Sequence, residues 1–392
     1  MLSIEEIDNL FKESNAFIEK IEVKFVPGKS IGSEKFPTAS FVSSGFCILV
    51  MHTSNGLTGV GEPSPYGGNV NNTMNAAIQI GKELKDAPLY KAWTYSAIDP
   101  KLFNTGYGEL AKQAVVAAIS QCCIDVIGKE LNKPVFKLLD PKSNGIVETY
   151  ASGGMIHSNQ SLNYYVEEAM KSKENGYMSW KFRPSTPRNL DHFQRNLSPP
   201  QIDLRAIKTT IINVAKECGD DFEILLDAGC RCKDIDEALE LCNFSSSYNV
   251  GFIEEPLIRD VKQYSVLRSN TKMKISSGET FFSSNQLLDW VSNRAIDIVQ
   301  PDSNLMSIRE VIKTFEIAKK NNIKIVFHNW ANAISNISNI SLASCMPSVC
   351  NYVESSIVHN PHRNELIEEP VKPILGKYKL YDKPGLNVDL IL

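Results

Sequence analysis

The sequence predicts an α/β protein, in which a (β/α)-barrel (a modified TIM barrel) carries an α+β capping domain formed by the N-terminal part and the C-terminal tail. Two observations lead to this prediction. Short apolar runs recur about every 25 residues with amphipathic segments between them, which is typical of strands that alternate with helices. Five of these runs stop at an acid or a histidine, and they cover residues 222–227, 250–254, 273–279, 296–302 and 323–328.

The N-terminal part of the chain has a different pattern. Residues 15–60 are expected to form strands, and a polar turn at residues 54–56 between apolar runs indicates a hairpin. From residue 71 to residue 139 the pattern is helical, and residues 110–128 place apolar side chains at three-and-four spacing before a closing glycine. We therefore predict an α+β domain over residues 1–143.

The barrel is predicted over residues 144–367, where short strands alternate with helices. A segment rich in Pro, Asn and Arg at residues 184–200 follows the second strand, at the end of the barrel where insertions shape substrate pockets. The closing segment, residues 368–392, is expected to return to the capping domain. The strands that complete the barrel are expected at residues 146–152, 176–182 and 348–354.

The composition is that of a soluble globular protein. The chain has 392 residues, 43% hydrophobic and 22% charged, and its formal net charge of -4 comes without a basic cluster, which argues against nucleic-acid binding. The N-terminus has early acids and no stretch of about 18 apolar residues follows, so we expect a cytoplasmic protein without a signal peptide or membrane span. The nine cysteines lack metal or redox spacing, and no glycine-rich nucleotide motif is present.

Three carboxylates are the candidate metal ligands. Asp227, Glu254 and Glu279 end successive predicted strands, and parallel strands bring such ends to one mouth. A single acid at a strand end is more often a helix cap or an ion-pair partner, but three acids at matching ends favour a shared ligand. Hard oxygen ligands suit Mg²⁺, whereas zinc would prefer histidine and cysteine.

The next two strands end in a candidate base. Asp302 and His328 would lie close together, and a carboxylate beside an imidazole fixes its tautomer and raises its basicity. Lys181 ends the second strand on the same rim, where a cation can hold a substrate carboxylate. Arg183 follows on the same side of the strand, and Glu354 ends the eighth strand, where it could donate a hydrogen bond or a proton. The alternatives are ordinary ion pairs for the two cations and a helix cap for Glu354.

This set of groups suits one elementary step. Removal of the proton α to a carboxylate creates a dianionic enediolate, which water stabilises poorly. A divalent cation with a lysine beside it would supply the missing stabilisation, of roughly several kcal/mol. We therefore expect proton abstraction from a carboxylic acid.

Several short motifs of the chain are similar to those of a known family. They are Leu226-Asp227-Ala228, Ile253-Glu254-Glu255-Pro256, Ser277-Gly278-Glu279, Gln300-Pro301-Asp302 and Phe327-His328, with Thr58-Gly-Val-Gly-Glu62 in the first domain. On these residues the chain resembles the enolase superfamily and, within it, the mandelate racemase/muconate lactonizing enzyme family, over nearly its whole length. The resemblance implies that Asp227, Glu254 and Glu279 bind Mg²⁺. It also implies that Asp302 and His328 form the base dyad and that the protein is a homo-oligomer.

The chain departs from the family pattern in its second strand. Lys181 matches the first lysine of the family's Lys-x-Lys motif, but Arg183 stands at the second, where racemases carry a base. A guanidinium, with a pKa above about 12, cannot readily accept a proton, so two-base racemisation is not expected. A single base, His328, fits β-elimination instead. The sequence therefore predicts a Mg²⁺-dependent dehydratase that converts a sugar acid to a 2-keto-3-deoxy acid.

Other functions stay open from the sequence. An epimerase, racemase or cycloisomerase would share the proton abstraction, and a non-catalytic sugar-acid binding protein would share the pocket. A Schiff-base aldolase that uses Lys181 would leave the three carboxylates without a role. The segments at residues 27–37, 62–68 and 184–200 are expected to select the acid, and His157 is either a residue of the mouth or a solvated loop histidine.

Overall fold

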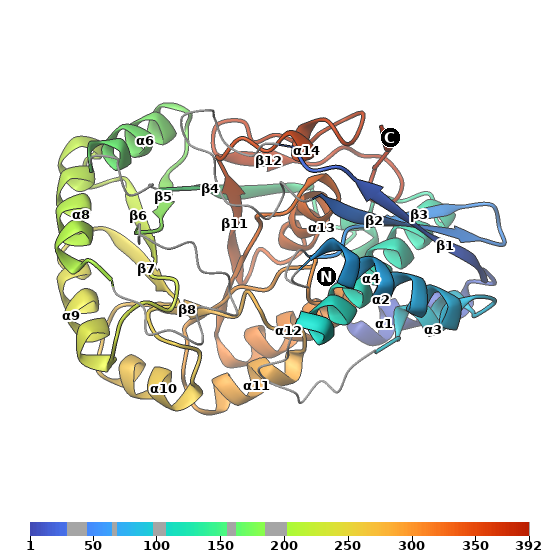
Figure 1. Cartoon of the computed structure of the whole chain (residues 1–392), viewed down its shortest axis with the longest axis horizontal. Helices are drawn as coiled ribbons and strands as arrows, with labels where there is room; N and C mark the ends of the chain where they lie inside the picture. Colours follow the sequence, from blue (N-terminus) through green and yellow to red (C-terminus); the bar gives the residue numbers. More distant parts are fainter. Residues whose placement is uncertain (30–44, 65–68, 97–106, 155–161, 185–201, 392) are drawn as a thin grey trace.

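The computed structural model describes residues 1–29, 45–64, 69–96, 107–154, 162–184 and 202–391 of the chain. A barrel lies beside a smaller α+β unit that is formed by the N-terminal part of the chain (Figure 1). His157 lies outside the described residues. So do most of the segments that were expected to select the substrate, at residues 27–37, 62–68 and 184–200.

The barrel is built from parallel strands that pair in sequence order. Within the described residues, eight strands run from β4 to β11, and β11 closes the ring by pairing with β4 at Val353 and Thr149. The ring of Tyr150 on β4 meets that of Phe252 on β7 with centroids 6.4 Å apart, so side chains fill the interior. The strands are β4 (Ile146–Gly153), β5 (Ser179–Phe182), β6 (Glu223–Asp227), β7 (Val250–Glu254), β8 (Ile275–Ser277), β9 (Ile298–Val299), β10 (Lys324–Phe327) and β11 (Cys350–Ser356).

Helices cover the outside of the ring, which confirms the predicted (β/α)-barrel (Figure 1). Several begin after an Asp whose side chain accepts a backbone N–H of the first turn, as Asp203, Asp234 and Asp260 do. The helices are α6 (Asn163–Glu174), α8 (Leu204–Cys218), α9 (Ile235–Ser245), α10 (Val261–Ser269), α11 (Ser284–Ser292), α12 (Ile308–Asn321), α13 (Ala333–Ser344) and the short α14 (Pro361–Asn364).

The N-terminal part combines an antiparallel sheet with helices, as the sequence predicted. In this sheet β1 pairs with β2, and the chain returns from β2 to β3 through the predicted hairpin turn, where the Gly56 N–H donates to the Thr53 carbonyl. The elements are β1 (Ile18–Val26), β2 (Phe46–Thr53), β3 (Thr58–Gly61), α2 (Val70–Leu84), α3 (Leu89–Trp93), α4 (Tyr107–Glu130) and α5 (Val135–Leu139).

A first helix, α1 (Ile4–Glu13), was not predicted. It begins with a capping box, in which the Ser3 side chain accepts from the Glu6 N–H and the Glu6 carboxylate accepts from the Ser3 N–H at 2.7 Å. The Asp8 carboxylate of α1 binds the guanidinium of Arg309 on α12 at 2.7 Å, which joins the helix to the barrel. The Ser-x-x-Glu pattern was the signal that could have found this helix.

Helix α4 is the core helix of the N-terminal unit. Its segment Gly108–Glu130 is long and apolar enough, by length and composition alone, to cross a membrane, but 89% of its 18-residue apolar stretch is buried inside the protein. The helix packs so closely on β3 that a Cβ at Gly61 would come within 2.1 Å of the Ala118 carbonyl oxygen. This close contact explains the glycine in the strand. A cytoplasmic location stays a prediction.

The C-terminal tail touches both units. Strand β12 (Lys377–Lys379) pairs antiparallel with β4 of the barrel. Farther along, the Gly385 carbonyl accepts from the Val135 N–H at 2.9 Å, and the Leu386 N–H donates to the Asp125 carboxylate at 2.8 Å. These contacts bring the tail to α4 and α5, while the domain boundaries after residues 143 and 367 stay a prediction.

A buried glutamate from the first unit caps a helix of the barrel. Glu62, just after β3, is 2% exposed. Its carboxylate accepts from the backbone N–H groups of Asn332 (2.8 Å), Ile334 (3.1 Å) and Ser335 (3.2 Å) at the start of α13. Burial raises the pKa of Glu62 to about 7, although the N–H groups of Asn332 and Ser335 lower it. The side chain of Asn332, the N-cap residue of α13, makes no capping hydrogen bond. Glu62 therefore caps α13 in its place and holds the segment between β10 and α13 in position.

Replacing Glu62 with alanine is expected to lower the free energy of unfolding by about 2–4 kcal/mol, because buried N–H groups at the start of α13 would lose their acceptor. Urea unfolding measures the loss. Asp234→Ala is a matched control, because it removes an exposed cap from α9 and should cost only about 1 kcal/mol. Equal losses for the two variants would contradict the bridging role of Glu62.

Candidate active site

The residues predicted for the site lie at the carboxyl end of the barrel. Asp227 and Glu254 are register partners at the ends of β6 and β7, and Lys181 is the partner of Ser152 near the ends of β5 and β4. The strands are parallel, so these ends meet at one mouth. The other predicted residues are Arg183 just after β5, Glu279 after β8, Asp302 after β9, His328 after β10 and Glu354 within β11.

Lys181 is a buried cation between two carboxylates. Its side chain is 4% exposed, and its ammonium donates to Glu254 Oε2 at 2.6 Å and pairs with Glu354 Oε1 at 2.8 Å. The ammonium also lies over the Tyr150 ring, 5.4 Å from the centroid. Burial lowers the pKa of Lys181, but the charges of Glu254 and Glu354 raise it well above its ordinary value. Lys181 therefore stays charged.

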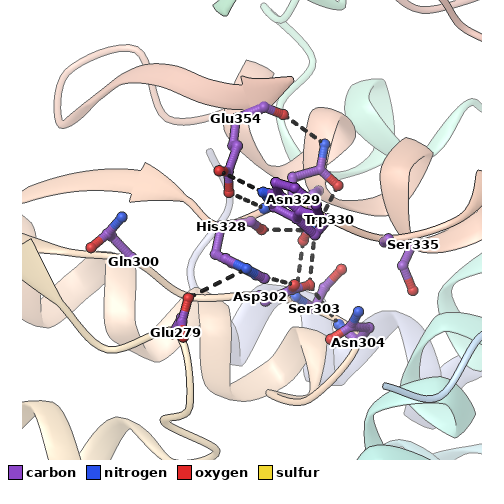
Figure 2. Close-up of polar contacts among 12 residues, drawn as sticks. Glu279, Gln300, Asp302, Ser303, Asn304, His328, Asn329, Trp330, Ser335 and Glu354 are labelled. Atoms are coloured by element: carbon purple, nitrogen blue, oxygen red, sulfur yellow. Dashed lines mark hydrogen bonds and ion pairs between the residues drawn. The ribbon is translucent and has the colours of Figure 1, made fainter. Parts of the chain in front are cut away.

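Glu354 accepts hydrogen bonds on both oxygens. Its Oε1 accepts from Ser152 Oγ (2.5 Å) and Trp330 Nε1 (2.9 Å), and its Oε2 accepts from the Asn329 N–H (2.9 Å), as Figure 2 shows for Asn329 and Trp330. Burial raises the pKa of Glu354, but Lys181 and His328 lower it below its usual range. This environment favours an ionised acceptor over the proton donor that the sequence suggested.

His328 lies between two carboxylates (Figure 2). Its Nδ1 is 2.7 Å from Asp302 Oδ2, and its Nε2 is 3.4 Å from Glu279 Oε2. The other Asp302 oxygen accepts from the Asn339 side chain at 2.9 Å, which holds the carboxylate in place. Burial lowers the pKa of His328, but Glu279 and the hydrogen bond with Asp302 raise it from 6.5 to about 10. The predicted pairing of Asp302 with His328 is thus present in the structure.

Each carboxylate predicted to bind metal is held by a cationic side chain. Arg183 Nε donates to Asp227 Oδ2 at 2.6 Å, Lys181 holds Glu254, and Arg259 Nη2 donates to Glu279 Oε1 at 3.3 Å. In this arrangement, no three carboxylate, imidazole or thiolate groups among the described residues are close enough together to hold one metal ion. The predicted three-carboxylate cluster is therefore not formed by the side chains as they stand.

The chemistry of the donors nonetheless fits a hard divalent cation. Glu254 Oε1 is a buried carboxylate oxygen that has no hydrogen-bond partner among the described residues, which is costly unless another positive group satisfies it. Burial raises the pKa of Glu254 to about 8, although Lys181 lowers it. Asp227 is the register partner of Glu254, so carboxylate oxygens of the kind that Mg²⁺ prefers stand on neighbouring strands.

The structure adds polar residues that the sequence analysis did not single out for the site. Gln300 Nε2 donates to Glu254 Oε2 at 2.8 Å, and Asn339 on α13 fixes Asp302. Every residue of α13 is buried although the helix repeats Ile-Ser-Asn. Polar side chains on a helix that is buried all round need partners, and this was the signal for Asn339. A small cavity is lined by Lys181, Arg183, Asp227, Trp330 and their neighbours.

Comparisons with known proteins agree with this architecture. The family model described as enolase C-terminal domain-like matches residues 164–391, which is more than half of the chain. The chain is similar in fold to the 3,6-anhydro-D-galactonate cycloisomerase from Zobellia galactanivorans, with a TM-score of 0.76 and 24% identity over 95% of this chain and 97% of that one. It is also similar in fold to a mandelate racemase/muconate lactonizing protein from Paracoccus denitrificans complexed with magnesium, with a TM-score of 0.77 and 18% identity over 96% of each chain.

Relatives are also found by sequence. The chain is 26% identical over 278 residues to the D-gluconate dehydratase of Thermoproteus tenax, a match that covers 70% of this chain but only 54% of that protein. It is 25% identical over 345 residues to the arabinonate dehydratase of Saccharolobus solfataricus, a match that covers 86% of both. With the family model over its barrel and the neighbouring folds over nearly its whole length, the chain belongs to the enolase superfamily and, within it, to the mandelate racemase/muconate lactonizing enzyme family.

Proposed function

We propose that the chain is a Mg²⁺-dependent dehydratase of a sugar acid. It removes the proton α to the carboxylate with the base pair His328 and Asp302 and yields a 2-keto-3-deoxy acid. The observation that carries the proposal is the buried imidazole whose Nδ1 is bound to Asp302 while its Nε2 points to Glu279 (Figure 2). The dehydratase names of two sequence relatives support the same reaction class.

The geometry of His328 supports this proton step. In the neutral imidazole, Asp302 accepts from Nδ1–H and the lone pair lies on Nε2, the nitrogen that faces Glu279. A substrate held near Glu279 would present its α carbon to this nitrogen. Asp302 also stabilises the imidazolium that forms when Nε2 takes the proton, because its carboxylate is fixed by Asn339.

The carboxylates proposed to hold Mg²⁺ are Asp227, Glu254 and Glu279. Bound there, the ion would stabilise the negative charge of the enediolate and offset the Glu279 charge that raises the pKa of His328. Lys181 contributes a second positive charge, since its ammonium is kept protonated by Glu254 and Glu354. Its position near the ends of β5 and β6 suits contact with the substrate carboxylate.

The elimination then balances with one base. His328 takes the proton from C2, the electron pair of the enediolate expels the hydroxyl from C3, and that hydroxyl leaves as water with the proton from His328. The resulting enol gains a proton at C3 and becomes the keto acid. Arg183 stands where a second base would be needed for racemisation, and its guanidinium stays protonated, which favours elimination over inversion.

A cycloisomerase is the second candidate, because one relative in fold is named as a cycloisomerase and the α-proton step would be shared. Solvent deuterium in recovered substrate without loss of water would favour an isomerase. Binding of a sugar acid without any α-proton exchange would favour a non-catalytic binding protein. The homo-oligomer stays a prediction.

Purified protein should convert at least one acid in a panel of mono- and diacid sugars to a keto acid when Mg²⁺ is present, and EDTA should abolish the reaction until Mg²⁺ is restored. Semicarbazide trapping of the keto group scores the panel. Arg268→Gln is the control variant, since it removes an arginine paired with Asp297 at the opposite end of the barrel. Undiminished turnover in EDTA would contradict the metal requirement.

A further inference from the structure

Arg183 makes an unusual contact for a residue at the position of a family base. Its Nε donates to Asp227 Oδ2 at 2.6 Å, and its Nη2 bonds to the same oxygen. The guanidinium side chain is 19% exposed and that of Asp227 is 3% exposed, so the pair is shielded from water.

We infer that Arg183 is a competing internal cation for the metal site: its guanidinium and a divalent ion contend for Asp227, and Arg183 must withdraw when the ion binds. The inference rests on the Mg²⁺ site of the proposed function. A guanidinium and a doubly charged ion bonded to one carboxylate oxygen would lie only a few ångströms apart, where like charges in a buried site repel strongly.

The backbone around Arg183 is anchored, so the exchange needs only the side chain to move. The Tyr165 hydroxyl donates to the Arg183 carbonyl at 3.2 Å, and Arg231 donates to the Pro184 carbonyl at 2.9 Å. Arg183 itself lies just beyond the end of β5, and the backbone pairing of β5 with β6 stops at Phe182. The remaining two carboxylates keep their own cations, since Lys181 holds Glu254 and Arg259 holds Glu279. Asp227 is thus the carboxylate whose counter-charge comes from a side chain beyond the end of a strand.

Because Arg183 competes with the ion for Asp227, it lowers the affinity of the site for metal. Arg183→Gln removes the competing charge but keeps a polar side chain of similar length, so Mg²⁺ should bind at least about tenfold more tightly than to the wild-type protein. Arg183→Lys keeps the charge on a single flexible ammonium, which loses the paired contact with Asp227 Oδ2, and it should bind about threefold more tightly. An ordinary structural ion pair predicts the reverse, because its loss would distort Asp227 and weaken the site.

Isothermal titration with Mg²⁺ alone measures these constants, with Arg268→Gln as the matched control. Arg268 pairs with Asp297 at 2.8 Å, so the control removes the same charge without touching the mouth, and its affinity should stay within about twofold of wild type. If Arg183→Gln does not fold, the Mg²⁺ affinity of Arg183→Lys decides whether the inference holds. Unchanged or weaker binding by the Arg183 variants overturns the inference while leaving the proposed function intact. If none of the proteins binds Mg²⁺, the proposed metal site fails, and the inference fails with it.

Discussion

Replacing His328 with asparagine should lower the rate of keto-acid formation by about a thousandfold, because the variant has no group that can take the α proton. Asparagine can still donate a hydrogen bond to Asp302 Oδ2, which His328 Nδ1 contacts at 2.7 Å, so the fold should persist. Steady-state rates with the acid found in the panel measure the loss, and thermal unfolding checks that the variant is folded.

Asp302→Asn separates the two members of the base pair. This change leaves the imidazole in place but removes the carboxylate that sets its tautomer, and we expect a loss of about a hundredfold or more. His52→Asn is a control outside the pair. The His52 imidazole on β2 contacts Glu22, so its replacement should not affect the rate. Wild-type turnover by a folded His328→Asn protein would refute the role of the imidazole as the base.

Replacing Lys181 with methionine should cost stability as well as activity. Both Glu254 and Glu354 would lose the buried ammonium that lies 2.6 Å and 2.8 Å from them, and a buried charge without its partner costs about 3–5 kcal/mol. The rate of keto-acid formation should fall by about 10²–10³-fold, because the cation beside the enediolate is gone. Urea unfolding in EDTA gives the stability, and the trapping assay gives the rate.

Lys208→Met is the matched control for this variant. Lys208 pairs with Glu240 at 2.6 Å, but Glu240 is 57% exposed, and a pair in contact with water contributes about 1 kcal/mol or less. Losing similar stability in both variants would show that Lys181 is not held as a buried counter-charge between two acids. A full rate in Lys181→Met would show that its ammonium does not act on the substrate.

The positions of the site residues could be predicted because, in a parallel barrel, residues at the ends of successive strands all lie at one mouth. Asp227 and Glu254 close strands β6 and β7 as expected. Glu279 and Asp302 lie beyond shorter strands than predicted, since β8 ends at Ser277 and the next residue, Gly278, turns the chain at a φ of +113°. The end of each strand could be inferred from its apolar run, but the exact length of the strand could not.

The partners of these residues could not be predicted from spacing. The contact of Arg183 with Asp227 joins a residue just after β5 to the last residue of β6 through a long arginine side chain. The rotamer of that side chain depends on every charge in the mouth. Gln300 belongs to the Gln300-Pro301-Asp302 motif, but its hydrogen bond to Glu254 depends on how the ring of strands brings β9 close to β7. Glu62 was noted for its motif, whereas its role as the cap of α13 depends on how the two units dock.

Proton exchange followed by NMR in D₂O tests the central claim most directly. The wild-type protein with Mg²⁺ and the active sugar acid should yield a keto acid that carries one deuterium at C3, while His328→Asn should leave the acid unchanged with its C2 proton in place. Equal release of the C2 proton by the two proteins would contradict the assignment of His328 as the base. Deuterium at C2 of recovered acid, with no keto acid formed, would contradict elimination.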